Sequence, residues 1–179
     1  DYGGPLFWAQ YSFLGLNPRG LSDAYADYWE QVCKHTRINY TDCVDNPKGY
    51  AGYGADCWGL TASDIPDGYT ASSPTNDRGV IAPTAALSSM PYTPDESMAA
   101  LRFFYYKLGD KLWSDYGFID AFDLTTGWFD RGMHIAIDQG PIVVMIENYR
   151  TGLPWNLFMS DKDVQRGLAE LGFTVEAGS

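Results

Sequence analysis

Apolar residues recur at intervals of three and four along most of this 179-residue chain, and no long stretch alternates apolar and polar residues. Intervals of three and four place side chains on one face of an α-helix, whereas a half-buried strand needs alternation. The clearest stripes run from Tyr25 to Thr36, from Met98 to Leu112 and from Ile142 to Leu157. The pattern predicts an all-α fold of stacked αα-hairpins.

Boundary residues predict where these helices begin and end. Ser22 is expected to cap the first long helix, which should end at Asn46 before a proline. The run Thr93–Glu96 has the order of a capping box with proline at the first helical position. A further helix is expected to begin at Pro141, and Pro154 should kink or break it.

Residues 46–80 interrupt the helical pattern with a segment rich in Gly, Pro, Asp, Ser and Tyr. An irregular segment of this length inside a compact domain is uncommon unless it is functional, so we expect an ordered loop. Cys43 and Cys57 flank its beginning. They either close a disulfide or remain buried free thiols, and the sequence leaves both open.

Composition and motifs exclude several classes of function. A formal net charge of -11 argues against nucleic acid as a partner and disfavours anionic membranes. The longest apolar run has six residues, far short of a membrane span. No CxxC, HExxH, Walker or GxGxxG motif is present, so we expect neither a metal site nor a cofactor. Serine hydrolase chemistry is also not expected, because His134 has no obvious serine partner.

Carboxylates remain as the candidate catalytic groups. The stretch from Gly117 to Arg150 places five acidic side chains among aromatic ones: Asp120, Asp123, Asp130, Asp138 and Glu147. Glycoside hydrolysis needs one carboxylic acid and one carboxylate. We take Asp138, Asp64 and Asp120 as catalytic candidates, with Asp138 first. A helix cap is the alternative for Asp138, and a turn is the alternative for Asp64.

Aromatic and polar residues near these acids are candidates for binding a sugar. Trp58 and Trp128 are stacking platforms or core residues, two interpretations that the sequence does not separate. Glu147 and Arg150 lie three apart on one helix face and would otherwise form a surface ion pair of little energetic value. The candidate binding residues are Trp58, Tyr69, Trp128, Phe129, Gln139, Glu147 and Arg150.

Four long segments resemble the glycoamylase-like glycoside hydrolase family, which includes bacterial endo-β-1,2-glucanases. They are CWGLTASDIPDGY (57–69), IAPTAALSSMPYTPDESMAALRFFY (81–105), YGFIDAFDLTTGWF (116–129) and AIDQGPIVVMIENYRTGLPWNLFM (136–159). The segment GGPLFWAQYSFLGLNPRG (3–20) fits as well. Two positions depart from the family pattern: Gln10 replaces an expected histidine, and residues 131–134 replace an acidic and aromatic approach.

The resemblance implies an (α/α)6 toroid with its site in the central cleft. Because the chain holds about half of the helices of a toroid, residues 1–179 would form the C-terminal half of the domain. The N-terminal half would then be a partner that supplies the general acid and covers the three apolar stripes. A periplasmic or secreted location and a glucan or oligosaccharide substrate, β-1,2-linked and cleaved with inversion, follow as expectations.

Three other functions stay open from the sequence. A non-catalytic half-domain would bind carbohydrate in the same groove without a second carboxylate facing it. A glucoamylase-type enzyme would cleave an α-glucan. A glycan phosphorylase would need a basic phosphate pocket, which 12 Lys and Arg residues do not favour.

Overall fold

The computed structural model describes residues 3–176 as a mostly helical chain with short strands. The helices are α1 (Phe7–Gln10), α2 (Tyr28–Asp45), α3 (Pro83–Leu87), α4 (Pro94–Tyr106), α5 (Gly109–Leu112), α6 (Ala136–Arg150), α7 (Leu153–Met159) and α8 (Lys162–Glu170), with 3₁₀ turns η1 (Tyr11–Phe13) and η2 (Pro74–Asn76). The strands are β1 (Leu21–Ser22), β2 (Ala62–Ile65), β3 (Gly68–Ala71), β4 (Trp113–Ser114), β5 (Gly117–Phe118), β6 (Phe122–Asp123), β7 (Trp128–Phe129) and β8 (Thr174–Val175).

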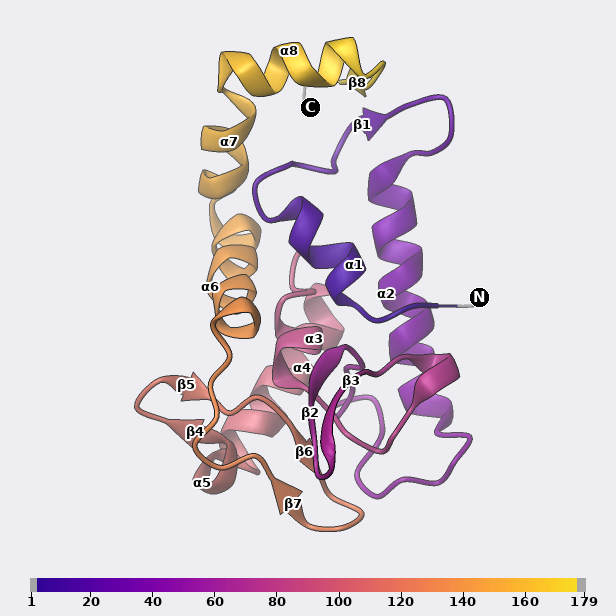
Figure 1. The fold of residues 1–179 in the computed structure, drawn as a ribbon, viewed down its shortest axis with the longest axis vertical. Helices are drawn as coiled ribbons and strands as arrows, with labels where there is room; N and C mark the ends of the chain where they lie inside the picture. The colour runs from indigo at the N-terminus through magenta and orange to yellow at the C-terminus, as the bar shows by residue number, and fades with distance from the viewer. Residues whose placement is uncertain (1–2, 177–179) are drawn as a thin grey trace.

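The short helix α3 lies at the centre of the molecule. In Figure 1, α2 and the run of α6 and α7 lie on opposite sides, with α1 and α3 between them. Every residue from 79 to 93 is buried, and α3 contacts both α4 and α6. The approach is close: a Cβ at Gly59, whose φ is +129°, would lie 2.9 Å from the Cβ of Ala85. Small side chains therefore let neighbouring segments pack directly onto α3.

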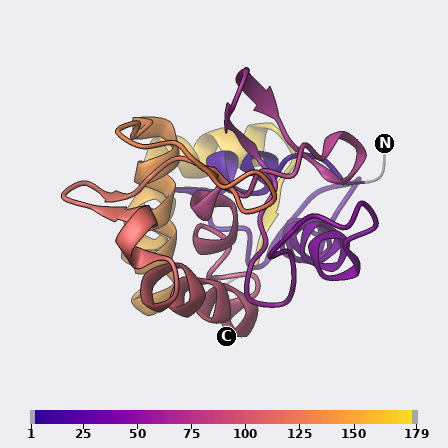
Figure 2. The same ribbon diagram turned by 90° about the horizontal axis from the view of Figure 1, so that it is seen from below.

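Two hydrophobic cores stabilise this arrangement. One gathers around Trp58, Phe104 and Phe122, next to the β-hairpins at one end of the molecule. The other gathers around Val32 and Trp155, between α2 and the C-terminal helices. Figure 2, seen from below, shows the β2–β3 hairpin projecting at one edge of the molecule, beside the helices. The site described below lies at this hairpin end.

The strands correct the expectation of an all-α fold. Residues 46–80 contain an antiparallel hairpin in which β2 pairs with β3 and Asp64 lies opposite Tyr69. Three further two-stranded sheets pair β1 with β8, β4 with β5 and β6 with β7. Asp64 therefore lies in a strand and not in a turn. Each strand has two to four residues, too short for alternation to stand out in the sequence.

Helix α2 begins later than expected. Asp27, not Ser22, is its N-cap, because the Asp27 side chain accepts a hydrogen bond from the backbone N–H of Glu30. The preceding Asp23 closes a turn by accepting from the N–H groups of Tyr25 and Ala26. The predicted end is confirmed: α2 stops at Asp45, and Asn46 has a left-handed φ of +46°.

Helix α6 begins earlier than expected, which places Asp138 inside its first turn and not ahead of it. The helix starts at Ala136, and Pro141 lies within it. The predicted break is confirmed, since α6 ends at Arg150, Gly152 has a φ of +69° and Pro154 lies in the first turn of α7. The N-cap Thr93 of α4 makes no capping bond with its side chain, and Glu96 pairs with Arg37, so the predicted capping box does not form.

The three cysteines are free thiols, and Cys43 and Cys57 are both buried. The possible Cys43–Cys57 disulfide is therefore not formed. Within residues 3–176, no helix has the length and apolar character that a membrane crossing requires.

Candidate active site

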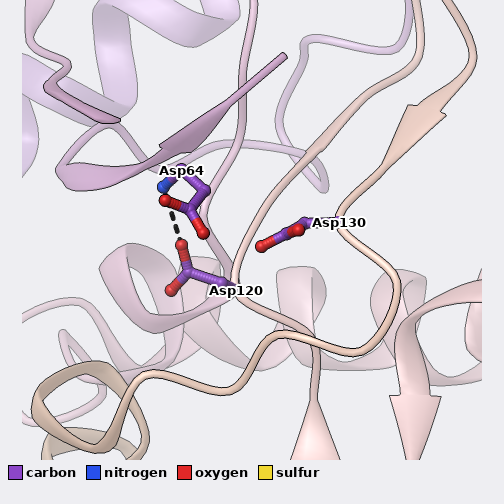
Figure 3. A group of neighbouring side chains, drawn as sticks. All are labelled: Asp64, Asp120 and Asp130. Carbon is purple, nitrogen blue, oxygen red and sulfur yellow. Dashed lines mark hydrogen bonds between the residues drawn. The ribbon is translucent and has the colours of Figure 1, made fainter. Parts of the chain in front are cut away.

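Four aspartates from separate elements converge at the hairpin end of the molecule. Asp64 comes from β2, Asp120 from the turn between β5 and β6, Asp130 from the residue after β7, and Asp138 from the first turn of α6. Figure 3 shows the carboxyl groups of Asp64, Asp120 and Asp130 turned toward one another. One oxygen from each of these three lies within 4.8 Å of the other two. Asp138 joins this group because it is in hydrogen-bonding range of Asp120. The structure thus brings together all three predicted catalytic candidates, Asp64, Asp120 and Asp138, and it adds Asp130.

Backbone pairing holds Asp120 and Asp130 in place. Ile81, just before α3, exchanges two backbone hydrogen bonds with Phe122, of 2.9 and 3.0 Å. The N–H of Asp130 donates to the carbonyl of Ala121 at 3.1 Å. The N–H of Asp64 donates to Oδ2 of Asp120 at 2.8 Å, which ties the β2–β3 hairpin to the same turn. Rigid elements on both sides therefore define the cluster.

Asp138 is held from two directions. The hydroxyl of Tyr11 donates to Oδ1 of Asp138 at 3.0 Å, and the hydroxyl of Thr84 donates to the Asp138 carbonyl at 2.7 Å. Its place in the first turn of α6 favours a negative charge, because the helix N-terminus carries partial positive charge. Asp138 is 1% exposed and Asp120 is 2% exposed. Oδ2 of Asp138 and Oδ1 of Asp120 are buried, and no fixed donor among residues 3–176 reaches either atom.

The cluster gathers four carboxyl groups without a basic partner in the described part of the chain. Among residues 3–176, no Lys, Arg or His forms an ion pair with any of the four aspartates. Burial, with Asp138 as a nearby charge, raises the pKa of Asp120 to about 7. Burial and the charge of Asp64 raise the pKa of Asp130 to about 6. At neutral pH the cluster can therefore hold and exchange protons.

Burial also raises the pKa of Asp138, although hydrogen bonds from Asp120 and Tyr11 oppose this rise. Two buried carboxyls side by side do not both ionise readily, because their charges repel. The Asp120–Asp138 pair resembles other carboxyl pairs in which one group keeps a proton while the other is charged. Such a pair can serve acid–base chemistry.

Carboxylate oxygens at this spacing are also the ligands that a hard divalent cation prefers. Asp64, Asp120 and Asp130 are the three residues that would hold such an ion. Sugar hydroxyls can donate to the same oxygens, so the cluster alone does not distinguish the two ligands. The expectation that the protein uses no metal and no cofactor stays a prediction.

Tyr69 lies beside the cluster, and three other predicted binding residues lie within two positions of Asp130 or Asp138 along the chain. Tyr69 is 55% exposed, and the charges of Asp138, Asp120 and Asp64 add to burial in raising its pKa. Trp128 is half-buried in β7. The ring of Phe129 stacks on Phe122, with centroids 6.0 Å apart. Gln139 donates to the carbonyl of Phe118 at 2.7 Å and so braces the loop that carries Asp120.

Trp58, Glu147 and Arg150 do not line the cluster. Trp58 is 0% exposed in the core and donates from Nε1 to the carbonyl of Glu96, so it cannot act as a stacking platform. Glu147 and Arg150 form an ion pair of 3.0 Å in the last turn of α6. Glu147 lies nine positions after Asp138 in α6, about 14 Å further along the helix axis.

Three features escaped the sequence interpretation. Tyr11 contacts Asp138 across the fold, and only the tertiary structure shows it. Asp130 belongs to the acidic stretch from Gly117 to Arg150, but no local pattern marked it as a catalytic candidate among the other acids there. His134 does have a serine partner, since its Nε2 lies 2.8 Å from Oγ of Ser114. Ser114 donates to the carbonyl of Gly117, so its proton is already committed and the pair is not an activated nucleophile.

A carboxyl cluster in which one group can hold a proton while another is charged can supply the acid–base pair that glycoside hydrolysis requires. Residues 1–162 match the family Glycoamylase, described as "Putative glucoamylase". The chain belongs to this family, as its sequence segments suggested.

Relatives in this family include proteins that act on β-1,2-glucans. The chain is 52% identical over 171 residues to an exo β-1,2-glucooligosaccharide sophorohydrolase (non-reducing end) of Parabacteroides distasonis, covering 94% of this chain and 24% of that protein. A crystal structure named as a putative glucoamylase from Bacteroides uniformis is 64% identical with a TM-score of 0.95, over 98% of this chain and 43% of that one. The endo-β-1,2-glucanase of Chitinophaga pinensis, solved with sophorotriose and glucose, is 57% identical with the same TM-score, over 97% and 42%. The chain thus spans from 24% to 43% of the length of these relatives.

Proposed function

We propose that the complete protein is a glycoside hydrolase that cleaves β-1,2-glucan or its oligosaccharides. The observation that supports this most directly is the convergence of Asp64, Asp120, Asp130 and Asp138, none of which is ion-paired within residues 3–176. Names of relatives that are 52% and 57% identical support the substrate class. Periplasmic or secreted location is part of the proposal, because a polymeric glucan does not cross a membrane unaided.

In the proposed mechanism Asp138 is the base, and the reaction inverts the anomeric configuration. A water molecule attacks the anomeric carbon while its proton passes to Asp138, and a general acid protonates the leaving oxygen. The general acid would lie outside residues 1–179. Asp64 and Asp130 are half-buried whereas Asp120 and Asp138 are buried, so a sugar would meet the former pair first.

We infer that residues 1–179 form the C-terminal half of an (α/α)6 toroid. Relatives extend well beyond the matched region, which leaves room for an N-terminal half that completes the cleft. That half would be the partner that supplies the opposite wall and the acid. Exposed apolar side chains on α6 and α7 support this inference, among them Tyr149, Leu153 and Leu157.

Product analysis with the full-length protein tests the proposed substrate. We expect release of glucose oligosaccharides from β-1,2-glucan and none from β-1,3- or α-1,4-glucan. Proton NMR of the first product formed should show the inverted anomer. Activity on α-1,4-glucan alone would instead support a glucoamylase-type enzyme.

Substitution of the proposed base separates catalysis from binding. Asp138→Asn in the full-length protein should abolish turnover, since general-base catalysis contributes about 10²–10⁴-fold, while oligosaccharide binding measured by calorimetry persists. Full activity in this variant would contradict the assignment of Asp138. Binding without turnover in the unaltered protein would instead indicate a non-catalytic carbohydrate-binding domain.

A further inference from the structure

Tyr11 makes a contact that the proposed mechanism does not yet use. It lies in η1, directly after α1, with its ring half-buried and 5.3 Å from the ring of Phe7. Its hydroxyl reaches Oδ1 of Asp138, a residue 127 positions further along the chain. Because Tyr11 occupies Oδ1, Oδ2 is the oxygen left to accept from a protonated Asp120.

Both members of this contact are attached to α3. The side chain of Gln10, the residue before Tyr11, donates from Nε2 to the carbonyl of Ala85 at 2.9 Å. Thr84, the residue before Ala85, donates to the carbonyl of Asp138 at 2.7 Å. Neighbouring residues of one buried helix thus fix the phenol and the carboxyl relative to each other. A site held by such supporting contacts loses little precision to side-chain motion.

The titratable groups facing Asp138 come from four elements and none of them is basic. They are Tyr11 from η1, Asp64 from β2, Tyr69 from β3 and Asp120 from the turn after β5. Burial, followed by the charge of Asp138, raises the pKa of Tyr11 well above its usual value, so its hydroxyl remains a donor at neutral pH. A donor to a carboxylate stabilises the charged form of that carboxylate.

We propose that Tyr11 is a positioning residue: its hydroxyl, by donating to Oδ1, fixes the orientation of the Asp138 carboxylate. This inference rests on the proposed function for its catalytic consequence. Tyr11 touches the carboxylate and is not itself a catalytic residue.

Tyr11→Phe removes the hydroxyl and keeps the ring. In the full-length protein we expect kcat on β-1,2-glucan to fall roughly tenfold or more, since a hydrogen bond to a charged group is lost. KM should change little, because Tyr11 contacts the carboxylate and not the sugar. The acidic limb of the kcat/KM profile should move to higher pH, because loss of the donor raises the pKa of Asp138.

Tyr28→Phe is the matched control. The Tyr28 hydroxyl donates to Oδ2 of Asp23 at 2.8 Å, the same kind of bond away from the cluster. This variant should keep the kcat, KM and pH profile of the unaltered protein. An equal loss of kcat in both variants, or an unshifted pH profile in Tyr11→Phe, would overturn the inference.

Carboxyl titration tests the inference without relying on activity. With ¹³Cγ-labelled aspartate, the Asp138 resonance should titrate at higher pH in Tyr11→Phe than in the unaltered protein. Identical titration would refute the role of Tyr11 even if the protein hydrolyses β-1,2-glucan. Failure of the proposed function would appear separately, as full activity of Asp138→Asn or as no hydrolysis at all.

A second variant covers the case in which Tyr11→Phe does not fold. Site-specific 3-fluorotyrosine at position 11 keeps the hydroxyl and makes it a stronger donor. The Asp138 resonance should then titrate at lower pH, a shift opposite to that of Tyr11→Phe. An unchanged or raised midpoint would contradict the inference.

Discussion

At the residue scale, the main property of the site is the burial of carboxyl groups that have no ion-pair partner in the described part of the chain. Asp120 illustrates the consequence for stability. Its pKa in the folded protein is about 7, raised from 3.8 by burial first and then by Asp138. A folded-state pKa above the unfolded value means that the folded protein binds the proton more tightly. The associated stability is present below about pH 4 and is lost as pH rises through about 7.

Asp120→Asn should therefore stabilise the protein at pH 8 more than at pH 4, because the amide carries no charge to bury. The amide oxygen can still accept from the N–H of Asp64. Thermal unfolding at the two pH values checks this, and each 1 kcal/mol gained should raise Tm by roughly 2–4 °C. Asp56→Asn, at an exposed loop position, makes the same charge change and should show no such pH dependence. A Tm difference independent of pH would contradict the prediction.

The catalytic candidates could be predicted from the sequence, but their ranking could not. Asp64, Asp120 and Asp138 stood out as acids near aromatic residues in irregular segments, and the fold places them together. Tyr11 could not be predicted, because a contact across 127 residues leaves no local pattern. The sequence also could not show that Trp58 is a core residue and not a stacking platform, because its burial depends on how distant segments pack around it.

At the element scale, side-chain caps decide where helices begin. Asp27→Ala should destabilise the protein by about 1 kcal/mol, because the Glu30 N–H loses its acceptor at the start of α2. Ser22→Ala serves as the control, since Ser22 lies in β1 and not at the N-cap of α2. Denaturant unfolding of both variants measures the difference. Equal effects would show that Asp27 does not cap α2.

Helix existence could be predicted from apolar spacing, whereas several boundaries and all strands could not. The end of α2 and the break after α6 followed from Asn46 and Pro154, which act locally on the backbone. The start of α6 at Ala136 did not follow, because Pro141 is a common helix starter and here lies inside the helix. The β2–β3 hairpin was missed because four-residue strands carry too little periodicity.

At the scale of the whole molecule, the exposed apolar side chains on α7 belong to the surface that the proposed N-terminal half would cover. Leu157 lies on the stripe expected to face the N-terminal half and is 64% exposed. Leu157→Asp in the full-length protein should lower Tm by several degrees, because a buried unpaired charge is costly.

Ala51→Asp is the control for this prediction. Ala51 is exposed in an irregular segment, so an added carboxylate there should leave Tm nearly unchanged. Differential scanning calorimetry of both variants makes the comparison. An equally small effect at Leu157 would show that this side chain stays in water in the complete protein.

The hydrogen bonds of the first helical segment have a consequence for protein synthesis. Tyr11 bonds to Asp138, the carbonyl of Phe13 accepts from Trp155, and the carbonyl of Leu14 accepts from Asn148. These partners lie 127 to 142 residues apart, so the early segment leaves the ribosome long before its partners exist. Closing such a long loop has an entropic cost that local contacts do not share, and it slows folding. The carboxyl cluster should therefore reach its final arrangement late, after α6 and α7 have been synthesised.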